Sequence, residues 1–141
     1  MGMAAAPIYP GSIKTPALAL TTANTTAAFS DFWTPSTSAG GKLASIAVTQ
    51  DSTDTIGLDW GISTGGTVYP IGVSTAISSG AGTDGTIAAV NALNTTSFPW
   101  IRNDGVNSYF LLEAGWKLKV KLRAPLDAGK TMYITGQAGD F

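Results

Sequence analysis

Hydrophobic and polar residues alternate most strictly near the C-terminus of the chain. Apolar and basic side chains take turns there in the order Trp116, Lys117, Leu118, Lys119, Val120, Lys121, Leu122 and Arg123. A period of two is typical of a β-strand with one buried face and one solvated face. Residues 131–135 are β-branched and aromatic and predict a second strand. Because Pro125 and Gly129 lie between the two, we predict that they form a hairpin.

Alternation also predicts the rest of the strands. Residues 55–62 have the second clearest pattern, and we expect this strand to pair with the basic one. Further strands are predicted at 14–22, 42–50 and 67–73. Pro16 and Pro70 place the first and last of these at sheet edges, because proline cannot donate a ladder hydrogen bond. Residues 87–93 are the one segment that favours a helix, of about two turns at most.

These elements predict an all-β fold. Six to eight short strands separated by turns every eight to twelve residues are typical of a single-domain antiparallel β-sandwich, and we expect a jelly-roll-like one over residues 14–141. Residues 1–13 contain Pro7, Pro10 and Gly11 among small residues. This segment is predicted to be an extended N-terminal arm, either frayed or lying on a neighbouring molecule.

Composition narrows the classes of function. The chain of 141 residues has no cysteine and no histidine, so the commonest metal ligand and general base are missing. Only 12% of residues are charged and the net charge is −1. Such a weak field argues against nucleic-acid partners, and no apolar stretch is long enough to span a membrane. We expect no cofactor. The low charge also suggests that part of the surface is covered by other protein.

The basic stripe formed by Lys117, Lys119, Lys121 and Arg123 has two interpretations. Charged strand exteriors are most often solvated faces. The alternative is a docking face for an acidic neighbour, or for the side of the adjacent strand that carries Asp59. Trp116 is expected to point to the opposite side, which leaves the stripe without an aromatic residue and argues further against nucleic-acid binding.

Two other segments are candidates for contact with a partner. Phe98, Trp100 and Arg102 form an aromatic and basic stretch of residue types favoured as interface anchors. The alternative is a loop folded over the open end of the sandwich. In the arm, the candidates are Ile8, Tyr9 and Pro10.

Acidic residues give weaker signals. Asp51, Asp54 and Asp84 match no calcium-binding loop, and turn-forming aspartates explain them better than a metal site. Glu113 with Asp104 or Asp127 could form a hydrolase pair, but nothing in the sequence indicates that they converge. We therefore expect no catalytic residue and no metal ligand.

Four segments resemble small virion proteins of tailed bacteriophages. They are 20–25 (LTTANT), Trp33-Thr34 followed by 38–48 (SAGGKLASIAV), 112–120 (LEAGWKLKV) and 136–141 (GQAGDF). The resemblance extends from Leu18 to Phe141, with 74–108 unmatched. Its motifs are turns and strand entries rather than catalytic signatures, so they indicate a virion more directly than a particular place within it.

The resemblance implies a β-sandwich that serves as a capsid decoration or auxiliary head protein. We therefore expect a structural, non-enzymatic protein that is made in the host cytoplasm and located on the head surface of the virion. Its expected partners are the major capsid protein and copies of itself, as a symmetric dimer or trimer. The alternative is a tail- or fibre-associated module that binds host glycan, with exposed aromatic residues such as Tyr69 or Trp100 lining a shallow groove.

Overall fold

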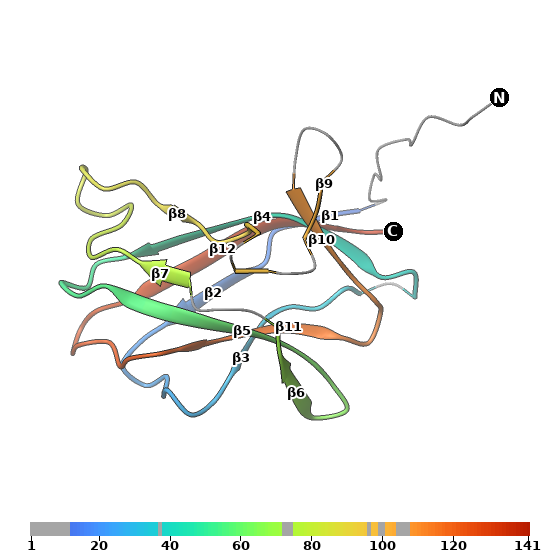
Figure 1. The fold of residues 1–141 in the computed structure, drawn as a ribbon, viewed down its shortest axis with the longest axis horizontal. Helices are drawn as coiled ribbons and strands as arrows, with labels where there is room; N and C mark the ends of the chain where they lie inside the picture. Colours follow the sequence, from blue (N-terminus) through green and yellow to red (C-terminus); the bar gives the residue numbers. More distant parts are fainter. Residues whose placement is uncertain (1–11, 37, 72–74, 96, 99–100, 104–107) are drawn as a thin grey trace.

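The chain folds into two antiparallel β-sheets packed face to face (Figure 1). The computed structural model describes residues 12–36, 38–71, 75–95, 97–98, 101–103 and 108–141. Strands dominate this part of the chain, and no helix occurs in it. The predicted all-β sandwich is confirmed.

One sheet has seven strands and the other has five. The seven-stranded sheet contains β1 (Ser12–Lys14), β2 (Ala17–Leu20), β4 (Gly41–Gln50), β8 (Val90–Asn91), β9 (Arg102–Asn103), β10 (Ser108–Leu112) and β12 (Met132–Asp140). The five-stranded sheet contains β3 (Ser30–Trp33), β5 (Ile56–Thr64), β6 (Thr67–Pro70), β7 (Thr75–Ile77) and β11 (Lys117–Leu122).

The strand order is that of a jelly roll. The main strands run β2-β12-β4-β10 in the first sheet and β3-β11-β5-β6 in the second. From β2 to β5 the chain crosses to the other sheet at each step, and it does so again from β10 to β12, so each sheet interleaves early and late segments. This double-sheet arrangement is the jelly-roll solution to the edge-strand problem.

The predicted partnership of the basic strand is confirmed. Strand β11 pairs with β5 over six residues, from Lys117 opposite Ser63 to Leu122 opposite Leu58. Leu118, Val120 and Leu122 of β11 are buried, as the alternation predicts. The proline-containing segments are also edges, since β1 and β2 border the first sheet and β6 borders the second.

The predicted hairpin of β11 and β12 is wrong. Strand β12 pairs with β4 in the seven-stranded sheet, whereas β11 belongs to the five-stranded sheet. Leu126, in the connection between them, is 4% exposed. Its side chain enters the core, so the connection crosses from one sheet to the other instead of turning back.

The predicted helix over residues 87–93 is also wrong. Val90 and Asn91 form strand β8 opposite β4, and the Ala92 N–H donates to the Ile46 carbonyl. A helix of two turns is not stable by itself. Pairing with β4 instead provides hydrogen-bond partners for the backbone of this segment.

A chain of aromatic rings crosses the core. Ring centroids lie 6.1 Å apart for Phe32 and Trp60, 5.2 Å for Trp60 and Phe98, and 5.6 Å for Phe98 and Phe110. Phe98 is fully buried. The prediction that Phe98 lies at an exposed contact site is therefore wrong. The alternative is confirmed for this residue: its side chain packs into the sandwich.

Strand β1 fixes the base of the N-terminal segment. Ser12, Ile13 and Lys14 pair with Asp140, Gly139 and Ala138 of β12. The last two residues of the predicted arm are therefore part of the sheet. Residues 1–11, including Ile8, Tyr9 and Pro10, lie outside the described residues.

Candidate docking surfaces

The basic stripe forms the outer face of the five-stranded sheet. Lys117 and Lys119 both pair with Asp31 of β3, with Nζ to carboxylate-oxygen distances of 3.2 and 3.1 Å. The Arg123 Nε lies 3.3 Å from a carboxylate oxygen of Asp59, so the expected contact with the Asp59 side of β5 is present. Each of these three cations thus has a partner within the chain.

The fourth cation of the stripe contacts an aromatic ring. The Lys121 Nζ lies 5.0 Å from the ring centroid of Phe29, the residue that precedes β3. Phe29 therefore shares the face of the stripe, contrary to the expectation that no aromatic residue does. The sequence could not indicate this, because Phe29 ends the loop before β3 and only the pairing of β3 with β11 brings it beside Lys121.

Asp31 is the electrostatic centre of the stripe. Partial burial would raise the pKa of its carboxyl group, but the hydrogen bonds from Lys119 and Lys117 and the charges of both ammonium groups outweigh this effect. The pKa of Asp31 is lowered as a result. Because the Asp31 side chain is 49% exposed, solvent screening limits what these pairs add to stability. Three of the four cations of the stripe are thus paired with carboxylates of the same sheet, as is typical of a solvated face.

The outer face of the seven-stranded sheet has a different composition. Its residues form four rows across β1, β2, β12 and β4: Ala19, Tyr133 and Thr49; then Ala17, Thr135 and Ala47; then Gln137 and Ser45; then Ile13, Gly139 and Lys42. We call these rows the uncharged face, because Lys42 at one corner is their single charged residue. Lys42 lies over the Tyr109 ring, 4.6 Å from its centroid.

Two of the most exposed large hydrophobic side chains belong to the uncharged face. Ile13 is 84% exposed and Tyr133 is 53% exposed. Both were missed as candidates from the sequence. The signal was present in the alternation of β12, where Tyr133, Thr135 and Gln137 all point outward and none is charged.

Of the other predicted contact residues, Arg102 lies on the exposed edge strand β9, opposite Tyr109. Trp100 lies outside the described residues. Asp84 behaves as the predicted turn former: its carboxylate accepts the Thr86 and Ile87 N–H groups at 2.8 Å, and these backbone hydrogen bonds lower its pKa. The Asp51 carboxylate instead accepts the N–H of Thr131, which is 80 positions away in the sequence, at 2.8 Å. Across the described ranges, no group of three or more potential metal ligands occurs.

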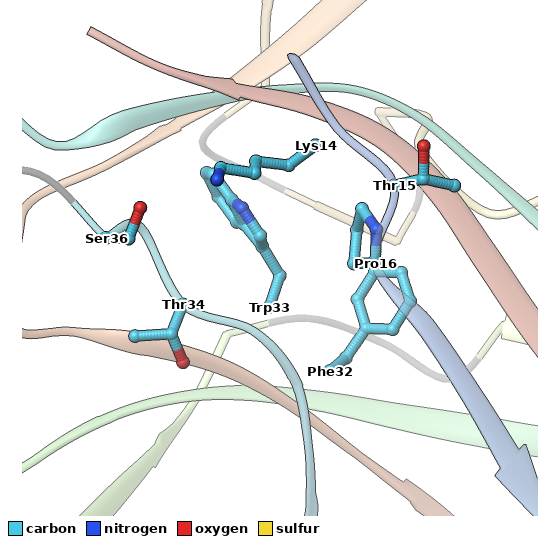
Figure 2. Close-up of a pocket in the computed structure, with 7 residues that line it drawn as sticks. All are labelled: Lys14, Thr15, Pro16, Phe32, Trp33, Thr34 and Ser36. Carbon is cyan, nitrogen blue, oxygen red and sulfur yellow. The ribbon is translucent and has the colours of Figure 1, made fainter. Parts of the chain in front are cut away.

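A cavity of about 290 Å³ opens between strands β1 and β3 (Figure 2). It is lined by Lys14, Thr15, Pro16, Phe32, Trp33, Thr34 and Ser36. Trp33 is 4% exposed and its Nε1–H has no hydrogen-bond partner. The Lys14 ammonium forms no ion pair with a described residue. The Lys14 side chain borders the cavity, whereas the Trp33 N–H is itself buried from solvent.

No protein-family model matches the chain, and no curated protein matches it. Within the described segments, no helix is long and apolar enough to cross a membrane.

Proposed function

We propose that this chain is a structural virion protein of a tailed bacteriophage that decorates the outer surface of the capsid. The resemblance of segments 20–25, 33–34 with 38–48, 112–120 and 136–141 to such proteins supports the class of protein. The jelly-roll order supports it at the level of fold analogy only, because this fold serves many functions, viral capsid and lectin domains among them.

The observation that carries the proposal is the difference in charge between the uncharged face, which covers β1, β2, β12 and β4, and the outer face of the five-stranded sheet. The five-stranded sheet displays Lys117, Lys119, Lys121, Arg123, Asp31 and Asp59 outward. The four rows of the uncharged face contain Lys42 alone. Depletion of charge together with exposed tyrosine is the compositional signal of a protein interface, whereas interspersed charges are typical of a solvated surface.

In this proposal the uncharged face docks on the capsid and the stripe faces solvent. Ile13 extends the apolar contact toward the N-terminal segment that contains Ile8, Tyr9 and Pro10. Strand β1 is short, and Pro16 separates it from β2, which does not favour addition of a further strand at that edge. A protein that binds the assembled lattice and not the free capsid subunits stabilises the shell by mass action.

Electron cryomicroscopy of virions tests where in the virion the protein is located. We expect regular copies of a sandwich-sized density across the head surface, with the β2-β12-β4 face toward the shell. Density confined to the tail or to a unique vertex would contradict the decoration role while leaving a virion role in place.

A pair of tyrosine variants tests the docking face. Tyr133 and Tyr69 have similar exposure, 53% and 48%, but lie on different sheets. Tyr133→Lys places a charge in the uncharged face and is expected to weaken cosedimentation with heads stripped of the protein by roughly tenfold or more, since burying an unpaired ammonium exceeds about 1.4 kcal/mol. Tyr69→Lys is expected to bind normally. Loss with Tyr69→Lys alone would assign docking to the edge of the five-stranded sheet where Tyr69 contacts Trp116.

The self-association partner, a dimer or trimer, remains a prediction of the same proposal. Light scattering coupled to size-exclusion chromatography measures it directly. A monomer at all concentrations, together with isolated copies on the virion, would contradict it.

A further inference from the structure

A second pocket lies between strand β5 of one sheet and strand β10 of the other. Its volume is about 280 Å³, and it is lined by Ile62, Leu111, Leu112, Glu113 and Trp116. We call it the β5–β10 socket. Pockets for drug-sized ligands begin at about 300 Å³, so the socket suits a group the size of one amino-acid side chain.

A tight turn builds the polar end of the socket. The Trp116 N–H donates to the Glu113 carbonyl at 3.2 Å, and Gly115 has a φ of +87°. A turn of this kind brings the first and fourth residues together. The Glu113 carboxylate and the Trp116 indole therefore border the same pocket.

Tyr69 of strand β6 extends the aromatic wall. It lies opposite Ile62 in the β5–β6 pairing, and its ring centroid is 6.0 Å from that of Trp116, with an angle of 43° between the ring planes. Tyr69 is 48% exposed. Two electron-rich rings thus stand beside an apolar floor, at the open edge of the sandwich.

The negative charge of Glu113 is not neutralised by the described part of the chain. The carboxylate of this exposed residue forms no ion pair or hydrogen bond there. The basic side chains at adjoining positions are engaged elsewhere: Lys117 binds Asp31, and Lys42 lies over Tyr109. A cation that entered the socket would meet no competing ammonium group bound to Glu113.

We propose that the β5–β10 socket binds an arginine side chain presented by a partner protein. The methylene stem of arginine matches the floor formed by Ile62, Leu111 and Leu112. Its planar guanidinium stacks on aromatic faces and pairs with carboxylates in a bidentate manner, which lysine cannot do. A cation over the face of tryptophan or tyrosine gains further attraction from the ring quadrupole.

The lining disfavours the glycan alternative at this place. A sugar carries many hydroxyl groups, each of which needs a hydrogen-bond partner when it leaves water. Glu113 is the one charged side chain among the residues that line the socket, and the Trp116 indole adds a single N–H donor. One carboxylate satisfies a guanidinium but leaves most sugar hydroxyls unpaired.

NMR titration of the full chain with small probes tests the proposal, and it does not depend on the capsid role. We expect N-acetylarginine amide to shift the amide signals of residues 113–116 and the indole signal of Trp116 in a saturable manner. N-acetyllysine amide should bind more weakly. N-acetylcitrulline amide, which has the same shape as the arginine probe without its charge, should bind more weakly still, and added salt should weaken the arginine complex.

Three variants sharpen the test. Glu113→Gln is expected to weaken arginine binding by about tenfold or more, because the charge-assisted hydrogen bonds are lost. Tyr69→Ala is expected to weaken it about two- to fivefold, the range for an exposed cation–π contact. Tyr133→Ala, which removes an equally exposed tyrosine from the other sheet, should leave it unchanged. Unshifted signals from the core will show that each variant is folded.

Several outcomes would overturn the proposal. They are the absence of a saturable shift with the arginine probe, equal binding of the citrulline probe, and full binding by Glu113→Gln. Shifts of the same signals by N-acetylglucosamine but not by arginine would assign the socket to sugars instead.

Discussion

The carboxylate of Asp140 accepts hydrogen bonds from the backbone N–H and the hydroxyl group of Ser36. The Ser36 N–H lies 3.3 Å from one carboxylate oxygen, and the hydroxyl group contacts the other. Asp140 is 1% exposed and ends strand β12, while Ser36 follows strand β3. The two residues therefore tie one sheet to the other at the edge where β1 and the cavity of Figure 2 lie.

Removing this tie should lower stability. Asp140→Ala deletes a buried acceptor of two hydrogen bonds, and hydrogen bonds to charged groups contribute about 1.5–3 kcal/mol. We expect a loss of that size in the free energy of unfolding, measured by urea denaturation. In a double-mutant cycle with Ser36→Ala, the two changes should be coupled by about 0.5 kcal/mol or more. Additive effects would mean that the contact does not hold the sheets together.

A second buried polar residue anchors the loops at the opposite end of β4. The Gln50 Nε2 lies 3.0, 2.7 and 3.0 Å from the carbonyl oxygens of Asp54, Ile77 and Ser78. We expect Gln50→Leu to cost about 1–3 kcal/mol in urea denaturation, because these acceptors lose their donor. Gln137→Leu, a matched change on the exposed side of β12, should stay within about 0.5 kcal/mol. Equal effects would contradict this role of Gln50.

The sequence predicted the strands well because one face of each sheet is buried. In β11 the buried and less buried positions alternate along the whole strand, and in β5 they alternate from Ile56 to Trp60, so period two locates the strands. In β4, Leu43 and Ile46 are both buried although three positions separate them. The pairing with β12 shifts between Gln137 and Ala138, and this irregularity restores the inward direction of both side chains.

Predictions from the sequence were wrong where the structure of a segment depends on residues far away in the chain. Pro125 and Gly129 indicated correctly that the chain turns, but turn residues do not determine which sheet the next strand joins. The buried Leu126 takes the chain across the sandwich instead. Likewise, aromatic character at Phe98 suggested an anchor, and only packing between Trp60 and Phe110 identifies it as core.

The candidate surfaces were visible only in part. The basic stripe is contiguous in sequence and was found, but Asp31, which neutralises two of its lysines, lies 86 positions from Lys117. The uncharged face and the β5–β10 socket each gather residues from strands far apart in the chain. No local pattern brings Tyr69 to Trp116, so these sites required the topology.

The charge pairs of the stripe predict a pH effect of known sign. The pKa of Asp31 is lowered from 3.8 in the folded protein, so its contribution to stability is complete above that value. It is lost as the pH falls below 3.8 through the lower folded pKa. Asp31→Asn should therefore cost less than about 1 kcal/mol at pH 7, and nothing at a pH below the folded pKa.

Urea denaturation of Asp31→Asn and the parent protein across this pH range measures the difference. Asp127→Asn, in an exposed loop, is the control and should show no difference that depends on pH. A deficit of Asp31→Asn that persists in acid would mean that packing, and not charge, accounts for it.

Gly115 links the stability of the fold to the geometry of the β5–β10 socket. Its φ of +87° is unfavourable for residues with a Cβ atom, although no atom lies within 4 Å of where that atom would be. Gly129, with a φ of +77°, is equally open and lies in the connection to β12. Gly115→Ala and Gly129→Ala should therefore each cost about 1–2 kcal/mol of stability through backbone strain alone.

Only Gly115→Ala should also weaken binding of N-acetylarginine amide, because it distorts the turn that holds Glu113 beside Trp116. Equal arginine binding by both variants would show that the turn does not shape the socket.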